Sequence, residues 1–122
     1  MRVVAPRSLQ EPTFLILTAL ASGPQHGYSV LVDVERISEG RVRLRAGTLY
    51  AALDRLRADA LIEVDREEVV DGRLRRYYSL TPSGAERLAA EAERAAHNAR
   101  AATRRLAALR LGGEALAAGG AA

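Results

Sequence analysis

Residues 47–61 read GTLYAALDRLRADAL and decide the fold, because they predict a short amphipathic helix, at residues 46–60, with one covered and one free face. At 100° per residue, the covered stripe holds Leu49, Leu53, Leu56 and Ala60. The opposite side carries Gly47, Thr48, Ala51, Asp54, Arg55 and Ala58, with Tyr50 and Arg57 on one flank. Small residues and one arginine outside a leucine stripe suit a DNA groove. The same pattern is also typical of an ordinary surface helix.

The composition indicates one globular domain with at most an extension. The chain has 122 residues, of which 48% are hydrophobic and 27% charged, and it has no Cys, which excludes disulfides and thiolate sites. A net charge of +3 is compatible with a polyanionic partner, although the all-arginine basic set also fits a GC-rich genome. No signal peptide or apolar run of transmembrane length occurs. We therefore expect a soluble cytoplasmic protein without a membrane partner.

Upstream of this stretch, the sequence predicts a loose arm at residues 1–10 and then two helices. Pro12 suits the first position of a helix that is apolar on nearly every side and ends at Gly23-Pro24, so it should be sandwiched between other elements. A second helix is expected from about residue 26 to residue 38, with Gly40 as its C-terminal cap. Residues 41–45 alternate arginine with apolar residues, which predicts a brief edge strand.

Downstream, the hydrophobic period changes to two and predicts a two-stranded ribbon. Asp71-Gly72 is a strong hairpin signal between the two arms. The return arm carries Arg73, Arg75 and Arg76, whereas the outgoing arm is acidic. Cross-strand ion pairing is one interpretation of these charges. Three arginines beside a turn exceed what pairing requires, and this favours contact with phosphate.

Thr81-Pro82 predicts the start of a long last helix, at residues 81–111. Apolar residues recur along it at spacings of four and three, which is a heptad seam. The seam consists of Leu88, Ala92, Ala95, Ala99, Ala102, Leu106 and Leu109. A domain of about 80 residues is too small to cover it, so a second copy of the chain is the simplest partner. Residues 112–122 are expected to form a frayed Gly/Ala-rich tail.

The ordered motifs resemble the PadR-like family of transcriptional regulators. The carriers are His26-Gly27-Tyr28, Gly47-Thr48-Leu49-Tyr50 with the leucines after it, Gly72-Arg73, and Tyr78 with Leu80-Thr81-Pro82-Ser83-Gly84. This resemblance covers residues 9–84 and implies a homodimer whose third helices enter successive major grooves of double-stranded DNA, with the wings on the flanking backbone or minor groove. It implies DNA contacts from Gly47, Thr48 and Tyr50, and from the three wing arginines. From side-chain chemistry alone, Arg55 suits a guanine edge.

Three departures from the family pattern concern Ala51, Leu74 and Ala60. The first two stand where family members often have proline. Ala60 stands where glycine commonly closes the third helix, and a left-handed backbone there would cost about 1 to 2 kcal/mol. The resemblance also implies a small hydrophobic effector at the dimer centre. Because the chain has no Trp, the seam offers such a ligand alanines and leucines in place of aromatic rings.

The expected architecture is mainly helical with a small β-wing: a winged helix-turn-helix at residues 11–80, followed by a long C-terminal dimerisation helix. The function predicted from it is a dimeric DNA-binding regulator, a repressor, released by an effector. The alternative is a winged-helix protein-protein interaction module without a DNA role. Catalysis is not expected, because no nucleophile has an evident base. With only His26 and His97 available, we expect no metal, and no cofactor.

Overall fold

Three helices form the first half of the structure, a computed structural model that describes residues 8–119. They are α1 (Glu11–Leu20), α2 (Gly27–Ile37) and α3 (Ala46–Ala58). Most of the predicted N-terminal arm lies outside the described residues. Five residues of α1 are buried, and they are Leu15, Ile16, Leu17, Ala19 and Leu20. The prediction that α1 is covered on several sides is confirmed, since side chains of both neighbouring helices and of the sheet join it in one core.

Both ends of α2 are closed by local hydrogen bonds. At its start, Nδ1 of His26 accepts a bond of 3.3 Å from the backbone N–H of Ser29. At its end, the N–H of Gly40 donates to the carbonyl of Glu35, and the N–H of Glu39 donates to that of Arg36. This pair of bonds is a Schellman motif. The first left-handed residue of the cap is therefore Glu39, with φ 54°, and the expected glycine follows it with φ 81°.

The prediction of an edge strand at residues 41–45 is wrong. The segment has no strand partner in the part of the chain that the structure describes. Its hydrogen bonds and ion pairs go to the helices instead: Arg41 lies 3.6 Å from Glu11, and Arg43 lies 3.2 Å from Glu35. The buried hydroxyl of Ser38 accepts a bond from the N–H of Val42. Alternation alone therefore identified an extended segment but not a paired one.

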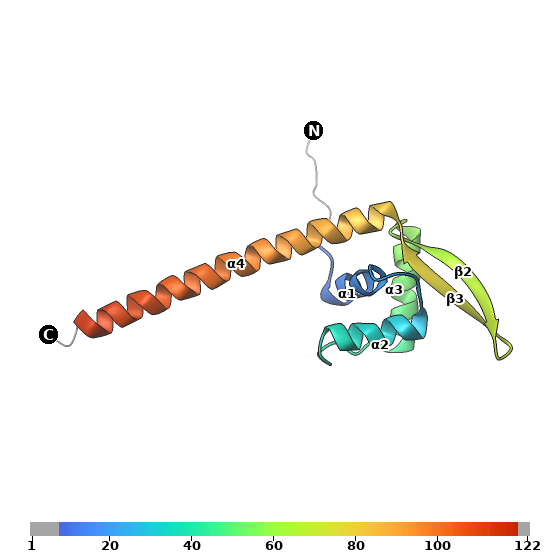
Figure 1. Ribbon diagram of the computed structural model, residues 1–122, viewed down its shortest axis with the longest axis horizontal. Coiled ribbons are helices and arrows are strands. Elements are labelled where there is room, and N and C mark those ends of the chain that lie inside the picture. Colours follow the sequence, from blue (N-terminus) through green and yellow to red (C-terminus); the bar gives the residue numbers. More distant parts are fainter. Residues whose placement is uncertain (1–7, 120–122) are drawn as a thin grey trace, which may run out of the picture. The chain divides into compact units, whose positions relative to one another are not determined.

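The sheet has three antiparallel strands in the order β1-β3-β2, of which β2 (Ile62–Val70) and β3 (Arg73–Leu80) form a long hairpin (Figure 1). Asp71 and Gly72 both have positive φ, 53° and 75°, as a type I′ turn requires. The hairpin prediction is confirmed. The third strand, β1 (Gln25–His26), pairs with Tyr77 and Tyr78 of β3. This strand has only two residues and directly follows Pro24, so it is too short for a hydrophobic period to predict it.

The last helix, α4 (Pro82–Gly119), begins where predicted. Oγ1 of Thr81 accepts from the N–H of Gly84 at 3.0 Å and donates to the carbonyl of Ala60 at 2.6 Å. Gly84 is buried against the backbone of Leu61, where a Cβ would collide with a carbonyl oxygen. Helix and wing are therefore tied to the end of α3.

The expected end of the last helix near Leu111 is wrong, because α4 continues to Gly119. A glycine pair at residues 112 and 113 costs helix about 1 kcal/mol per residue, but the surrounding alanines, leucines and glutamate are strong helix formers and no proline follows. The predicted frayed tail is thus helical over residues 112–119. The chain divides into two units, residues 1–91 and 92–122, and the described residues of the second form the distal part of α4.

Candidate nucleic-acid interface

The outward face of α3 is free, as its periodicity predicts. Leu49, Leu53 and Leu56 are buried, with Ala52 beside them. The exposed residues of the opposite side are Gly47, Thr48, Ala51, Asp54, Arg55 and Ala58. Only Ala60 departs from the prediction, since it is exposed rather than part of the stripe. It lies beyond the last residue of the helix, with φ 58°, so helical spacing no longer applies to it.

The first turn of α3 is open to a ligand. Arg45 occupies the N-cap position but makes no side-chain capping bond, so the first N–H groups have no side-chain acceptor within the described chain. A Cβ built on Gly47 would meet no described atom within 4 Å. Thr48 adds an exposed hydroxyl one residue later. Free N–H groups at a helix N-terminus are suited to bind an anionic oxygen such as that of a phosphate.

The ring of Tyr50 lies against Gly27. The Cζ and Cε1 atoms of the Tyr50 ring lie 2.8 and 2.9 Å from the position that a Cβ of Gly27 would occupy. A larger residue at the start of α2 would displace the outer end of this ring, and 48% of the tyrosine is exposed. This contact joins the two sequence motifs that open α2 and α3. Periodicity within either helix gives no signal for it.

The three wing arginines are not equivalent. Arg76 lies in an ion pair with Glu67 at 3.1 Å, directly across the hairpin. Cross-strand pairing thus accounts for this residue. Arg73 and Arg75 form no ion pair with a carboxylate of the described residues, although the charge of Arg75 helps to lower the pKa of Glu68.

The carboxylate of Glu68 accepts hydrogen bonds from one residue of its own strand and from one residue of β3. Nε of Arg66 donates to its carboxylate at 3.0 Å, and the hydroxyl of Tyr77 donates at 3.2 Å. These hydrogen bonds, that from Arg66 first, lower the pKa of Glu68. The guanidinium of Arg66 also lies over the Tyr77 ring, 4.0 Å from its centroid. Most of the acidic arm is therefore neutralised locally, and the cationic side chains nearest the turn remain available.

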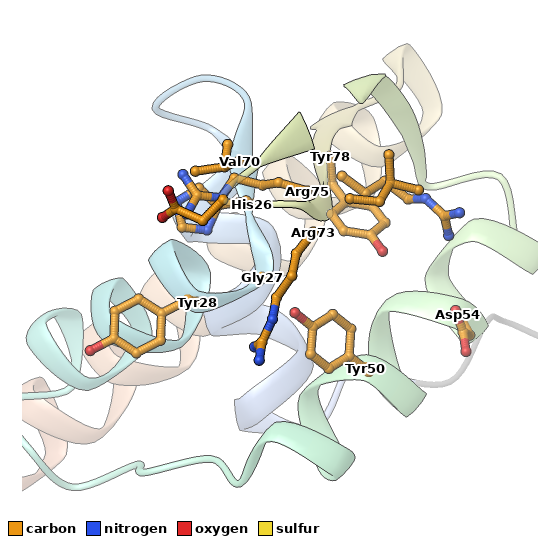
Figure 2. Close-up of a pocket in the computed structure, with 12 residues that line it drawn as sticks. His26, Gly27, Tyr28, Tyr50, Asp54, Val70, Arg73, Arg75 and Tyr78 are labelled. Atoms are coloured by element: carbon orange, nitrogen blue, oxygen red, sulfur yellow. The ribbon is translucent and has the colours of Figure 1, made fainter. Parts of the chain in front are cut away.

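A cleft of about 800 Å³ connects the wing with α2 and α3. Its lining residues are His26, Gly27, Tyr28, Tyr50, Asp54, Val70, Asp71, Arg73, Leu74, Arg75, Arg76 and Tyr78, and we call it the wing cleft. Figure 2 shows the side chain of Arg73 reaching from β3 into this cleft, between the rings of Tyr28 and Tyr50 in that view. Gly47, Thr48 and Arg55 line a second cleft, between α3 and the start of α1. The predicted α3 residues therefore fall on two sides of the helix.

Among the polar residues of the wing cleft that the sequence analysis did not select are Tyr28 and Asp54. Tyr28 is 71% exposed at the start of α2, and Asp54 projects from the outward face of α3. A tyrosine on the outer face of the second helix is a sequence signal that could have identified Tyr28. Asp54 was placed correctly on the free face of α3. It was not selected as a DNA contact, because a carboxylate was not expected against a polyanion. A carboxylate can accept a hydrogen bond from the amino group of cytosine.

His26 lines the wing cleft and contacts β3. Its ring meets Tyr77 edge-on, with 5.4 Å between centroids. Burial lowers the pKa of His26, and the positive charge of Arg75 lowers it further, while Glu68 acts in the opposite direction. A neutral imidazole is also what the capping bond to Ser29 requires, because Nδ1 must keep its lone pair. No cluster of three potential metal ligands occurs among the described residues.

The predicted seam lies on both sides of the boundary between the two units. Leu88 is half-buried and packs against the core of residues 1–91. The other six seam residues are all exposed in the single chain, Leu106 to 52% and Leu109 to 70%. These two leucines are among the large apolar side chains that the isolated chain leaves in water.

Comparison with known proteins decides the family. The family model of the PadR-like transcriptional regulators matches residues 16–90. The chain belongs to this family. That PadR-like segment contains α2, α3, the wing and the start of α4, hence the wing cleft and every wing arginine.

Individual PadR relatives agree with this assignment. The chain is 48% identical over 50 residues to the transcriptional regulator Rv3488 of Mycobacterium tuberculosis, which covers 41% of the chain and 46% of that protein. A PadR family regulator from Clostridium difficile has a TM-score of 0.65 at 24% identity, covering 80% of this chain and 99% of the other. Bacillus subtilis PadR in complex with operator DNA has a TM-score of 0.56 at 22% identity, covering 62% and 43%.

The extent of these matches differs between relatives. The aligned segments span 21% to 64% of the length of three curated relatives. The solved structures show the winged-helix fold, in agreement with the mainly helical architecture expected from the sequence. Among the described helices, none has the length and apolarity needed to cross a bilayer.

Proposed function

We propose that this PadR-like chain is a dimeric DNA-binding repressor that inserts α3 into the major groove and lays the wing along the flanking backbone or minor groove. The observation that carries the proposal is the free face of α3 beside two wing arginines, Arg73 and Arg75, that have no carboxylate ion pair in the described structure. Unpaired cations next to an open helix face are suited to a polyanion with a readable groove. The complex of Bacillus subtilis PadR with operator DNA supports the same partner here.

The side chains divide into positioning and reading roles. The open first turn of α3, with Gly47 and Thr48, is suited to a phosphate oxygen, and it would fix the helix in the groove. Arg55 is exposed two turns later and suits the O6 and N7 atoms of guanine. Tyr50 lies close to Gly27 and would present only part of its ring to the DNA. Specificity would then rest on few direct base contacts.

Dimerisation would follow from the exposed seam of α4. Leu106 and Leu109 leave much apolar surface in water, and the alanines between them and Leu88 allow two helices to approach closely. A two-fold dimer would bind a palindrome with half-sites about one helical turn apart. Repression would result from occupancy of a promoter. A small hydrophobic effector bound among alanines and leucines of the seam would change the half-site spacing and release the DNA.

A salt titration with matched wing variants tests the DNA interface. The double substitution Arg73→Ala/Arg75→Ala should weaken binding to a fluorescent duplex. It should also reduce the slope of log K against log salt by about one for each phosphate that the variant no longer neutralises. Arg76→Ala is the matched control, because that guanidinium is already occupied by Glu67, and it should have a much smaller effect. An effect of Arg76→Ala as large as half that of the double variant would show that the three arginines are equivalent and would contradict the assigned roles. Absence of duplex binding by the unaltered protein would favour the protein-protein module.

A further inference from the structure

The tip of the wing carries an exposed apolar pair. Val69 and Leu74 lie directly opposite each other in the register of β2 and β3, one pair in from the residues that flank the turn. Val69 is 74% exposed and Leu74 is 59% exposed, so both keep most of their surface in water. These values place them among the most exposed large apolar side chains of residues 8–91.

Hairpin stability alone does not explain this pair. Cross-strand apolar pairs contribute roughly 0.2 to 1 kcal/mol, and they do so by covering each other. Here the two side chains cover little of each other's surface, since each remains more than half exposed. A threonine pair would hold the strands as well and would avoid the solvation cost of two aliphatic groups. The pair therefore suits a partner that covers it.

The charges around the tip restrict what that partner is. Leu74 lines the same cleft as Arg73 and Arg75, which make no ion pair in the described chain, and Asp71 is the only carboxylate of residues 69–75. Glu67 and Glu68, further along β2, are held by Arg76 and Arg66. The covering partner must therefore offer an apolar recess with an anionic rim. The minor groove of duplex DNA has this combination, with sugar walls between two rows of phosphates.

We propose that the wing tip inserts Val69 and Leu74 into the minor groove beside the base pairs that α3 contacts, and that this insertion bends the DNA. Arg73 binds a phosphate on the rim of the groove. Apolar side chains that enter a minor groove unstack neighbouring base pairs, and pyrimidine-purine steps resist this least. The inference rests on the proposed DNA-binding function and adds a preference for flexible steps at the edges of the operator.

The test measures bending and affinity together, by energy transfer between dyes at the two ends of a duplex obtained by selection with the unaltered protein. Val69→Ser with Leu74→Ser should remove most of the bend and weaken binding by about five- to tenfold. Val69→Ile with Leu74→Met keeps the apolar surface and should retain both. Val32→Ser, a change of similar chemistry on α2 at a residue that does not line the wing cleft, is the matched control.

Each outcome decides the inference. A serine variant that binds and bends like the unaltered protein overturns the wing-tip insertion while leaving the DNA-binding function intact. The same holds if Val32→Ser causes an equal reduction, or if the apolar variant behaves like the serine variant. If the unaltered protein binds no duplex, both the proposed function and this inference fail. A retained thermal unfolding midpoint shows that the exposed substitutions have left the fold unchanged.

Discussion

At the scale of single residues, Ala60 ends α3 in a backbone conformation that alanine disfavours. The N–H of Leu61 bonds to the carbonyl of Leu56, and that of Ala60 bonds to Arg57, which completes a Schellman motif. The left-handed position of this motif, with φ 58°, is one that alanine rarely adopts. The carbonyl of the same residue accepts the hydroxyl of Thr81, so tertiary contacts fix the strained turn.

Ala60→Gly should therefore stabilise the protein by about 1 kcal/mol, because glycine adopts the left-handed region without the Cβ penalty. Urea unfolding followed by circular dichroism measures the change. The matched control is Ala58→Gly, two residues earlier but helical, which should destabilise by a similar amount. Destabilisation by both substitutions would show that backbone entropy outweighs the strain at Ala60.

His26 predicts a pH dependence of stability. Burial and Arg75 lower its pKa in the folded chain below the value of 6.5, so the unfolded chain binds a proton more readily. This group therefore destabilises the fold as the pH falls from about 6.5 through the lowered pKa, and its effect is absent above 6.5. His26→Asn keeps a capping acceptor without titrating. Unfolding free energies at about pH 8 and about pH 5.5 should differ less in this variant, and an unchanged difference would contradict the assignment.

At the scale of elements, the seam of α4 gives the prediction with the largest effect. Leu106→Glu with Leu109→Glu places like charges on the exposed stripe and should give monomers in sedimentation velocity, with operator binding strongly reduced. Glu91 and the first turns of α4 belong to the other unit, so the winged domain should keep its unfolding transition. A dimer that persists with both glutamates would place the subunit interface elsewhere.

Elements with a long, strongly periodic pattern could be predicted from the sequence, whereas those defined by a partner could not. The covered stripe of α3, the Asp71-Gly72 turn and the Thr81 cap follow from local chemistry. The two-residue strand β1 exists only because β3 lies beside it, and the segment 41–45 has the alternation of a strand but no edge to join. The continuation of α4 past two glycines likewise depends on accumulated propensity rather than on any single signal.

At the scale of the whole molecule, the candidate site depends on contacts between distant motifs. The helix that carries Thr48 and Arg55 could be identified from spacing, and so could the basic arm of the wing. Which arginines are available depends on the register that sets Arg76 against Glu67, and the position of Tyr50 depends on the approach of α2 to α3. Neither relation can be predicted from the residues of a single helix or strand. Both become visible only when the three helices and the hairpin are assembled.

The most direct test of DNA recognition by α3 and the wing is selection from a random duplex library, followed by dimethyl sulfate footprinting of the selected sequence, which reports the accessibility of guanine N7 in the major groove. The proposal predicts an enriched palindrome with half-sites about one helical turn apart and protection in successive major grooves. The double variant Thr48→Ala/Arg55→Ala should enrich no sequence. Enrichment of no sequence by the unaltered protein, or an identical palindrome selected by the α3 variant, would contradict it.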